Sequence, residues 1–147
     1  TKLFLQTAPD LAVFGEKDYQ QLCVVRQLCR DLDIPVEIIG APTVRDVHGL
    51  AMSSRNAYLD EAGLAVARQL NKILRGAAAA IAKNGDADGE TVRARRALQQ
   101  AGFEGVDYVA ARDALTLGEW QSEREGRLLA AGWLGKTRLI DNVEIPT

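Results

Sequence analysis

Residue types on which many common active sites depend are scarce in this 147-residue sequence. There is one histidine, His48, so the chain cannot build a metal site from several histidines or a histidine pair. The two cysteines, Cys23 and Cys29, lie six residues apart on a predicted helix, a spacing that suits neither a disulfide nor a zinc ion. We therefore expect two core thiols in a cytoplasmic protein.

Strong net charge and long apolar runs are also missing. The formal net charge is −2, and the apolar and charged fractions of 47% and 26% are normal for a globular protein. A charge this small gives no non-specific attraction to nucleic acid or to a membrane surface. No apolar run approaches the roughly 20 residues of a membrane span. We expect neither nucleic acid nor membrane as a partner.

The first forty residues alternate between strand and helix patterns. The run Leu11–Phe14, followed by a glycine, predicts a buried strand, and residues 17–32 carry the apolar stripe of an amphipathic helix. Pro35 ends that helix, and Val36–Ile39 predicts a second strand. This order predicts a right-handed βαβ unit of a parallel sheet. One unit leaves part of such a sheet uncovered, and Thr1–Leu5 reads as the end of an apolar helix, so we expect a piece of a longer protein.

The pattern changes after residue 56, where we place a domain boundary. A helix is predicted from the N-cap Asp60 to about Gly85, and a second one over residues 88–101. About three antiparallel strands follow: Val106–Arg112, Leu128–Leu134 and Thr137–Asp141, the last two joined by a two-residue turn. Residues 57–147 are therefore predicted to form a small α+β domain.

Residues 41–56 read as a long irregular connection, and such loops are usually functional in compact proteins. Within this connection, Gly49–Asn56 (GLAMSSRN) combines two serine hydroxyls with a guanidinium. These groups are suited to holding phosphate oxygens. The alternative is ordinary capping, in which serine or asparagine side chains satisfy backbone N–H groups. The loop by itself leaves both interpretations open.

A second anion-binding candidate is the turn that begins at Gly15. Ligands bind at the carboxyl ends of parallel strands, where a helix N-terminus offers free N–H groups. Lys17 could reach a phosphate there, and Gln21 lies one turn later. The alternative is a surface turn with an exposed charge pair. Because both loops follow strands of one βαβ unit, together they predict a nucleoside triphosphate site, with His48 beside it rather than acting as a general base.

Several motifs carry a resemblance to a known family. In order along the chain they are residues 14–21 (FGEKDYQQ), Arg45 with residues 49–59 (GLAMSSRNAYL), residues 131–135 (AGWLG) and residues 138–142 (RLIDN). They resemble the C-terminal half of the pantoate–β-alanine ligase (pantothenate synthetase) family. The resemblance implies a Rossmann-like nucleotidyltransferase fold of the HIGH/KMSKS type. Residues 1–56 would be the last βαβ part of its nucleotide-binding domain, including the KMSKS-like loop, and residues 57–147 a C-terminal lid domain.

The resemblance also implies a reaction. The family is an ATP-dependent ligase that activates the pantoate carboxylate as pantoyl adenylate and releases pyrophosphate. The amine of β-alanine then attacks, AMP leaves and pantothenate forms. Pantoate, β-alanine and ATP are thus the expected small-molecule partners, with Mg²⁺ accompanying ATP, in a cytoplasmic parent enzyme that is a homodimer.

The resemblance assigns roles by position. ATP would be contacted by Gly15, Glu16, Lys17, Asp18, Val44, Met52, Ser53, Ser54 and Arg55, of which Lys17, Ser53, Ser54 and Arg55 would be catalytic. Gln21 would bind pantoate, and no protein metal site is expected. The family's His-x-Gly-His segment is absent, so we expect the isolated chain to be inactive. His48 stands where the family usually has an acidic residue. The alternative to a ligase is a non-catalytic interaction module built on residues 57–147.

Overall fold

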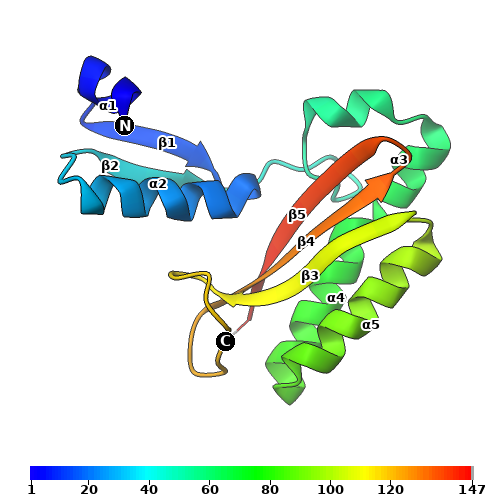
Figure 1. The fold of residues 1–147 in the computed structure, drawn as a ribbon. Coiled ribbons are helices and arrows are strands. Elements are labelled where there is room, and N and C mark those ends of the chain that lie inside the picture. Colours follow the sequence, from blue (N-terminus) through cyan, green and yellow to red (C-terminus); the bar gives the residue numbers. More distant parts are fainter. Residues whose placement is uncertain (147) are drawn as a thin grey trace. The chain divides into compact units, whose positions relative to one another are not determined.

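The structure is a computed structural model that describes residues 1–146, and the chain divides into two compact units, Thr1–Thr43 and Val44–Thr147 (Figure 1). The first unit contains α1 (Lys2–Thr7), β1 (Leu11–Gly15), the 3₁₀ turn η1 (Glu16–Asp18), α2 (Tyr19–Asp31) and β2 (Glu37–Ala41). The second contains the 3₁₀ turn η2 (Ser54–Tyr58), α3 (Glu61–Ala67), α4 (Gln69–Asn84), α5 (Ala87–Ala101), β3 (Gly105–Asp113), β4 (Gly126–Leu134) and β5 (Thr137–Ile145). None of the described helices has the length and apolar character that a membrane span requires.

The first unit is a βαβ arrangement, as predicted. β1 and β2 pair in parallel, with Leu11 opposite Glu37 and Gly15 opposite Ala41, and α2 connects them. The helix predicted over residues 17–32 begins as η1 and continues as α2. It ends before Asp33, whose φ of 48° takes the chain out of helical geometry.

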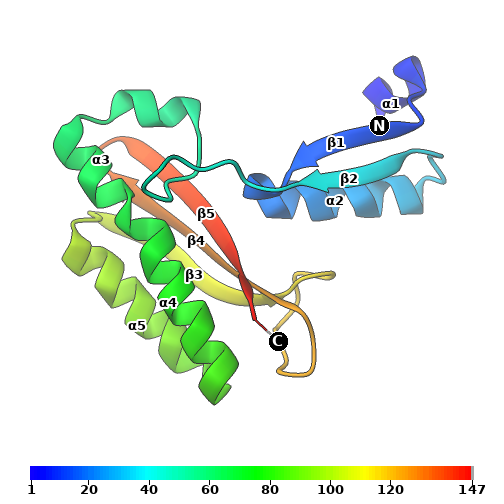
Figure 2. The ribbon, with the colours of Figure 1, turned by 180° about the vertical axis from the view of Figure 1, so that it is seen from behind.

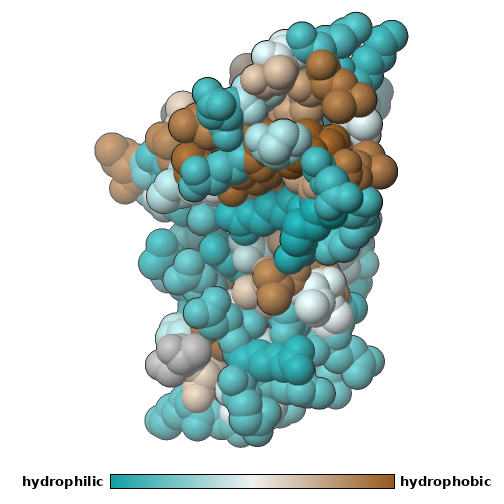
Figure 3. Space-filling view, turned by 90° about the vertical axis from the view of Figure 1, so that its left-hand side faces the viewer, coloured by the Kyte–Doolittle hydropathy of each residue, from teal (hydrophilic) through white to brown (hydrophobic). Residues whose placement is uncertain are grey.

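The prediction that the first strand is buried is wrong for one of its faces. Side chains alternate along β1, so Ala12 and Phe14 are half-buried while Leu11 and Val13 are 53% and 59% exposed. The reason is that α2 lies along only one face of a two-stranded sheet (Figure 1). Figure 3 looks onto the side of the molecule that carries α1 and these strands, and apolar side chains, drawn brown, are visible on its surface.

The second unit is a three-stranded antiparallel sheet covered on one face by helices. The strand order is β3-β4-β5, and Figure 2 shows α4 and α5 lying across the sheet. The turn between β4 and β5 is the predicted two-residue hairpin turn, with Gly135 at φ 54°. The prediction of a small α+β unit with about three antiparallel strands is confirmed for this unit.

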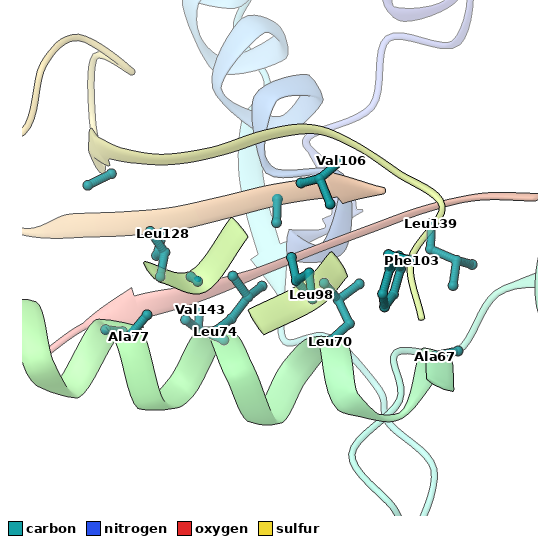
Figure 4. Close-up of a cluster of buried hydrophobic side chains, with 14 of the residues drawn as sticks. Ala67, Leu70, Leu74, Ala77, Leu98, Phe103, Val106, Leu128, Leu139 and Val143 are labelled. Atoms are coloured by element: carbon teal, nitrogen blue, oxygen red, sulfur yellow. The ribbon is translucent and has the colours of Figure 1, made fainter. Parts of the chain in front are cut away.

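A continuous apolar core lies between the sheet and these helices. Figure 4 shows Leu70, Leu74 and Ala77 of α4 pointing toward Leu128 and Val143 of the sheet. In β4 and β5 every second residue is buried, as expected for strands whose alternate side chains face the helices. This core positions the segments that flank it, including the one that precedes α3, because Leu50 is one of its members.

The helix predicted from Asp60 to Gly85 is two helices, and the single-helix prediction is wrong. The termini agree, since Asp60 caps α3 by accepting a hydrogen bond from the Gly63 N–H (2.7 Å) and Gly85 ends α4 in the left-handed region. The break falls at Arg68, where neither proline nor glycine interrupts the apolar pattern. Arg68 itself keeps right-handed helical angles (φ −62°, ψ −20°), and Ala67 and Leu70 on either side of it are buried, so no local helix-breaking residue marks the break.

The two compact units meet between Thr43 and Val44, which lies before the predicted domain boundary at residue 56. Residues 44–56 group with the second unit, into whose core Leu50 and Ala51 are packed at 5% and 3% exposure. The functional division into a nucleotide-binding domain over residues 1–56 and a lid over residues 57–147 stays a prediction.

Candidate functional site

The first candidate segment, Gly15–Asp18, lies at the carboxyl end of β1, where the chain enters α2. Gly15 has extended backbone geometry (φ −68°), and a Cβ added to it would meet no atom within 4 Å. Neither backbone conformation nor internal packing therefore demands glycine here. Open space above a bare backbone is what a closely approaching ligand requires.

The side chains around this turn are suited to an anion. Asp18, the N-cap of α2, makes no side-chain cap hydrogen bond to this 13-residue helix, whose N-terminus is the positive end of the helix dipole. Lys17 is half-buried beside it, and Gln21 is exposed on the first turn of α2. The first unit thus brings the predicted residues Gly15, Lys17 and Gln21 to one end of its sheet.

The second candidate segment is more ordered than predicted. Residues 44–52 form a small hairpin in which the Met52 N–H donates to the Val44 carbonyl (2.9 Å) and the Asp46 N–H donates to that of Leu50 (2.9 Å). Gly49, at φ 88°, closes its turn. The prediction of an irregular connection over residues 41–56 is wrong here, because an Asp-x-x-Gly turn and a 3₁₀ turn organise it.

The carboxylate of Asp46 holds this turn. It accepts hydrogen bonds from the backbone N–H groups of His48 (2.9 Å) and Leu50 (2.8 Å). Burial raises the pKa of the Asp46 carboxyl, but these two N–H groups and the nearby charge of Arg68 outweigh it and hold the pKa below its usual range. His48 itself is exposed on the turn.

Met52–Arg55 follow the hairpin. The Ser53 hydroxyl accepts a hydrogen bond from the Arg55 N–H (3.2 Å) and thereby caps η2, so the capping interpretation holds for this serine. Met52, Ser54 and Arg55 are exposed. Within the described part of the chain, the Arg55 guanidinium makes no hydrogen bond or ion pair. The backbone of the segment is therefore held by hydrogen bonds, while the side chains of Ser54 and Arg55 are exposed.

A buried ion pair, which no sequence pattern predicted, connects the hairpin of the second segment to β5. The guanidinium of Arg45 donates to both carboxylate oxygens of Asp141 in β5, at 2.7 and 2.9 Å. The two residues are 96 positions apart, so no local pattern could have paired them. Both had appeared only within the motifs that carry the family resemblance.

The predicted site residues thus form two groups. Gly15–Asp18 and Gln21 lie in the first unit, and Val44 with Met52–Arg55 lie in the second, where the Met52 N–H bonds to Val44. Among the described residues, no group of three or more histidine, cysteine, aspartate or glutamate side chains is arranged to hold a metal ion. Between them the two groups contain a lysine, an arginine and two serine hydroxyls, which are side chains suited to phosphate oxygens.

Comparison with known proteins identifies the family. The sequence model of the family described as "Pantoate-beta-alanine ligase" matches residues 1–144. The pantothenate synthetase of Mesorhizobium japonicum is 72% identical over 145 residues, which cover 99% of this chain and 51% of that protein. The pantothenate synthetase of Caulobacter vibrioides is 55% identical, over 98% of this chain and 52% of that protein.

Solved structures agree. The crystal structure of pantothenate synthetase from Thermus thermophilus matches with a TM-score of 0.86 and 39% identity, over 99% of this chain and 53% of that one. Pantoate-beta-alanine ligase from Francisella tularensis, crystallised with "Beta-gamma ATP and Beta-alanine", matches with a TM-score of 0.72 and 30% identity, over 99% and 48% of the two chains.

The fold is therefore that of a stretch of pantothenate synthetase. This chain belongs to the pantoate–β-alanine ligase family. It spans about half the length of the curated relatives it matches.

Proposed function

We propose that this chain supplies the ATP-gripping part of an ATP-dependent ligase that joins pantoate to β-alanine through pantoyl adenylate. Family membership supports the reaction class, and the Francisella relative was crystallised with an ATP compound and β-alanine. The observation that carries the assignment within this chain is the second segment: Ser54 and Arg55 are exposed, while the backbone beneath them is hydrogen-bonded into a hairpin and a 3₁₀ turn.

Charge development explains what these residues would do. In the first step a pantoate oxygen bonds to the α-phosphorus of ATP while the bond from that phosphorus to the pyrophosphate oxygen breaks. Negative charge therefore grows on the departing pyrophosphate. Lys17 and Arg55 would stabilise it, assisted by the hydroxyls of Ser53 and Ser54. One pre-positioned donor of this kind is typically worth about 2.7–4 kcal/mol of barrier.

The remaining assignments follow the same arrangement. Gly15 and Glu16 would line the nucleotide beside the start of α2, Val44 and Met52 would meet it from the hairpin, and Gln21 would hold pantoate. Mg²⁺ usually binds through substrate phosphates with one or two carboxylates rather than in an all-protein cage. The described residues suit that mode, with Asp18 as the exposed carboxylate next to Lys17. When bound, the ion would neutralise phosphate charge.

We further propose that the complete enzyme is a cytoplasmic homodimer and that the 147-residue chain alone does not turn over. The His-x-Gly-His segment of the family does not occur in this sequence. The alternative, a non-catalytic interaction module, is favoured by one observation: the described residues of the second unit have a core of their own that includes none from the first.

A hybrid enzyme decides between these candidates. In it, this chain replaces the matching stretch of the Mesorhizobium pantothenate synthetase, and the unmodified relative serves as the positive control. We expect pantoate-dependent exchange of radioactive pyrophosphate into ATP by the hybrid enzyme and none by the isolated chain. A folded hybrid without exchange would contradict the ligase assignment, and exchange by the isolated chain would contradict its proposed inactivity.

A further inference from the structure

Both partners of the ion pair between Arg45 and Asp141 are largely withdrawn from solvent. The side chain of Asp141 is 2% exposed and that of Arg45 is 17% exposed. Removing two charges from water is costly, and an apolar pair of similar volume often stabilises a fold as well or better. A contribution to stability therefore does not by itself account for this pair.

The Asp141 carboxylate is also hydrogen-bonded to groups of β5 and α4. Besides the two Arg45 nitrogens, Asp141 accepts from the Asn71 side-chain amide (3.1 Å) and from the backbone N–H of Asn142 (2.8 Å). Asn71, buried in α4, in turn accepts from Arg75 Nε (2.9 Å). The carboxylate is thus fixed to β5 and α4 before Arg45 reaches it, which makes it a rigid anchor.

The other end of the pair is the hairpin that carries the second candidate segment. Arg45 also donates to the Gly49 carbonyl (3.1 Å), and its backbone forms an antiparallel bridge to Ala51, the residue before Met52. The Asn56 side-chain amide donates to the Ala51 carbonyl (3.1 Å), which ties η2 back to the same point. The bridge itself is made by the neighbours of Arg45, since Val44 accepts from the Met52 N–H and the Asp46 N–H donates to Leu50. Contacts therefore connect Asp141, through Arg45 and the hairpin it belongs to, to the start of the Met52–Arg55 segment, and Asn56 connects the end of that segment to the same hairpin.

We propose that Asp141 and Arg45 are positioning residues that hold Met52–Arg55 at a fixed place on the second unit, so that Ser54 and Arg55 meet the ATP phosphates without first being ordered. This inference rests on the proposed function for its consequence in catalysis. Its structural part, a tether that restrains the segment, is independent of that function. Pre-ordering matters because a donor that must be immobilised on binding loses part of its affinity to that cost.

The 147-residue chain itself tests the tether. In Asp141→Asn one of the two carboxylate oxygens becomes an amide nitrogen that faces the Arg45 donors. We expect backbone amides of residues 50–56 to exchange hydrogen at least about tenfold faster in this variant, as measured by mass spectrometry. Arg45→Lys keeps the charge but loses the bidentate geometry, so it should increase the exchange rate by a smaller factor. It provides the test if Asp141→Asn does not fold.

Asp113→Asn is the matched control. Asp113 has a side chain 6% exposed, pairs with an arginine (Arg124 at 3.3 Å) and lies in the same unit, but its hydrogen bonds and ion pair reach no residue of the hairpin. Its substitution should leave exchange in residues 50–56 unchanged. Equal acceleration in both variants, or none in Asp141→Asn and Arg45→Lys, would overturn the tether.

The hybrid enzyme tests the catalytic consequence. Asp141→Asn should raise the KM for ATP about tenfold and leave the KM for β-alanine unchanged, while Asp113→Asn changes neither. A purely structural role predicts equal loss for every substrate, and that result would overturn the positioning role. If the unsubstituted hybrid shows no exchange activity, the proposed function has failed, whereas the hydrogen-exchange result still decides the tether.

Discussion

The two units of this chain differ in how far each buries its own apolar side chains. In the second unit a sheet and two helices enclose a continuous core, with Leu74 and Leu128 at 0% exposure. In the first, the large apolar side chains Leu3, Leu5, Leu11 and Val13 are more than half exposed. A unit of 43 residues with one covered sheet face is near the lower limit for independent folding. The second unit is therefore the better-packed platform of the two.

The two candidate segments also differ in how firmly each is attached to its unit. Gly15–Asp18 sits on a short parallel pair, whereas the 44–58 region is fastened to the large core by Leu50 and by the buried Arg45–Asp141 pair. A grip loop on a stable platform can be pre-ordered, which lowers the cost of binding.

The largest expected effect separates the two cores. Leu74→Ala should lower the free energy of unfolding of the second unit by about 2–5 kcal/mol, because it opens a cavity in a close-packed layer. Leu22→Ala, equally buried in the first unit, should leave that value unchanged. Urea unfolding followed by tryptophan fluorescence checks this, since both tryptophans, Trp120 and Trp133, lie in the second unit. Equal losses would mean that the units unfold as one.

The next effect compares the two phosphate-binding candidates. In the hybrid enzyme, Arg55→Ala and Lys17→Ala should each lower kcat roughly 10²–10³-fold, as expected for the loss of one charge-stabilising donor. Thermal unfolding of Arg55→Ala should match that of the unsubstituted hybrid, because Arg55 is exposed and substitutions at such sites usually shift stability by no more than about 0.5 kcal/mol. An unchanged rate in either variant would remove that residue from the site.

A smaller effect distinguishes a capped helix from an uncapped one. Asp60→Ala should cost about 1 kcal/mol, because the Asp60 carboxylate accepts a hydrogen bond from the Gly63 N–H at the start of α3. Asp18→Ala should lose no cap energy, since Asp18 makes no such bond to α2. The loss is measured by urea unfolding for Asp60→Ala and by circular dichroism melting for Asp18→Ala. A full cap penalty at Asp18 would contradict the absence of a side-chain cap hydrogen bond from Asp18.

The smallest effect is a pH dependence confined to the second unit. The Thr116 N–H is the main cause that lowers the pKa of Asp113 to about 2; burial opposes it, and the Thr116 hydroxyl, the Leu115 N–H and Arg124 add to the lowering. Because the folded-state pKa lies below the ordinary value of 3.8, this contribution is fully present above that pH and is lost as pH falls toward 2. Asp113→Asn should flatten the dependence of urea midpoints between these values. An unchanged slope would contradict the lowered pKa.

Most of the secondary structure was predictable because its signals are local. Asp60 at a helix start, Gly85 and Gly102 at helix ends and Gly135 in a hairpin turn each act on neighbouring residues, and the structure confirms all four. The exposed face of β1 was not predictable, because an apolar run does not reveal what covers it.

The sequence predicted which residues make up the candidate site, but not the local structure that holds them. Hydroxyls and a guanidinium in Met52–Arg55 indicated phosphate chemistry, and the resemblance named the reaction class. The hairpin behind them went unpredicted, although Asp46 and Gly49 carry a recognisable turn signal. The two interpretations of the loop also prove compatible, since Ser53 caps η2 while Ser54 and Arg55 stay exposed.

By itself, the sequence determined the βαβ order, the α+β unit, the capping residues and the family, because turns, caps and periodicities act over a few residues. Tertiary structure alone decided three things: the helix break at Arg68, the burial of only one face of β1, and the pairing of Arg45 with Asp141 across 96 positions. Each depends on which surfaces meet when the chain packs, and that information is spread over the whole fold.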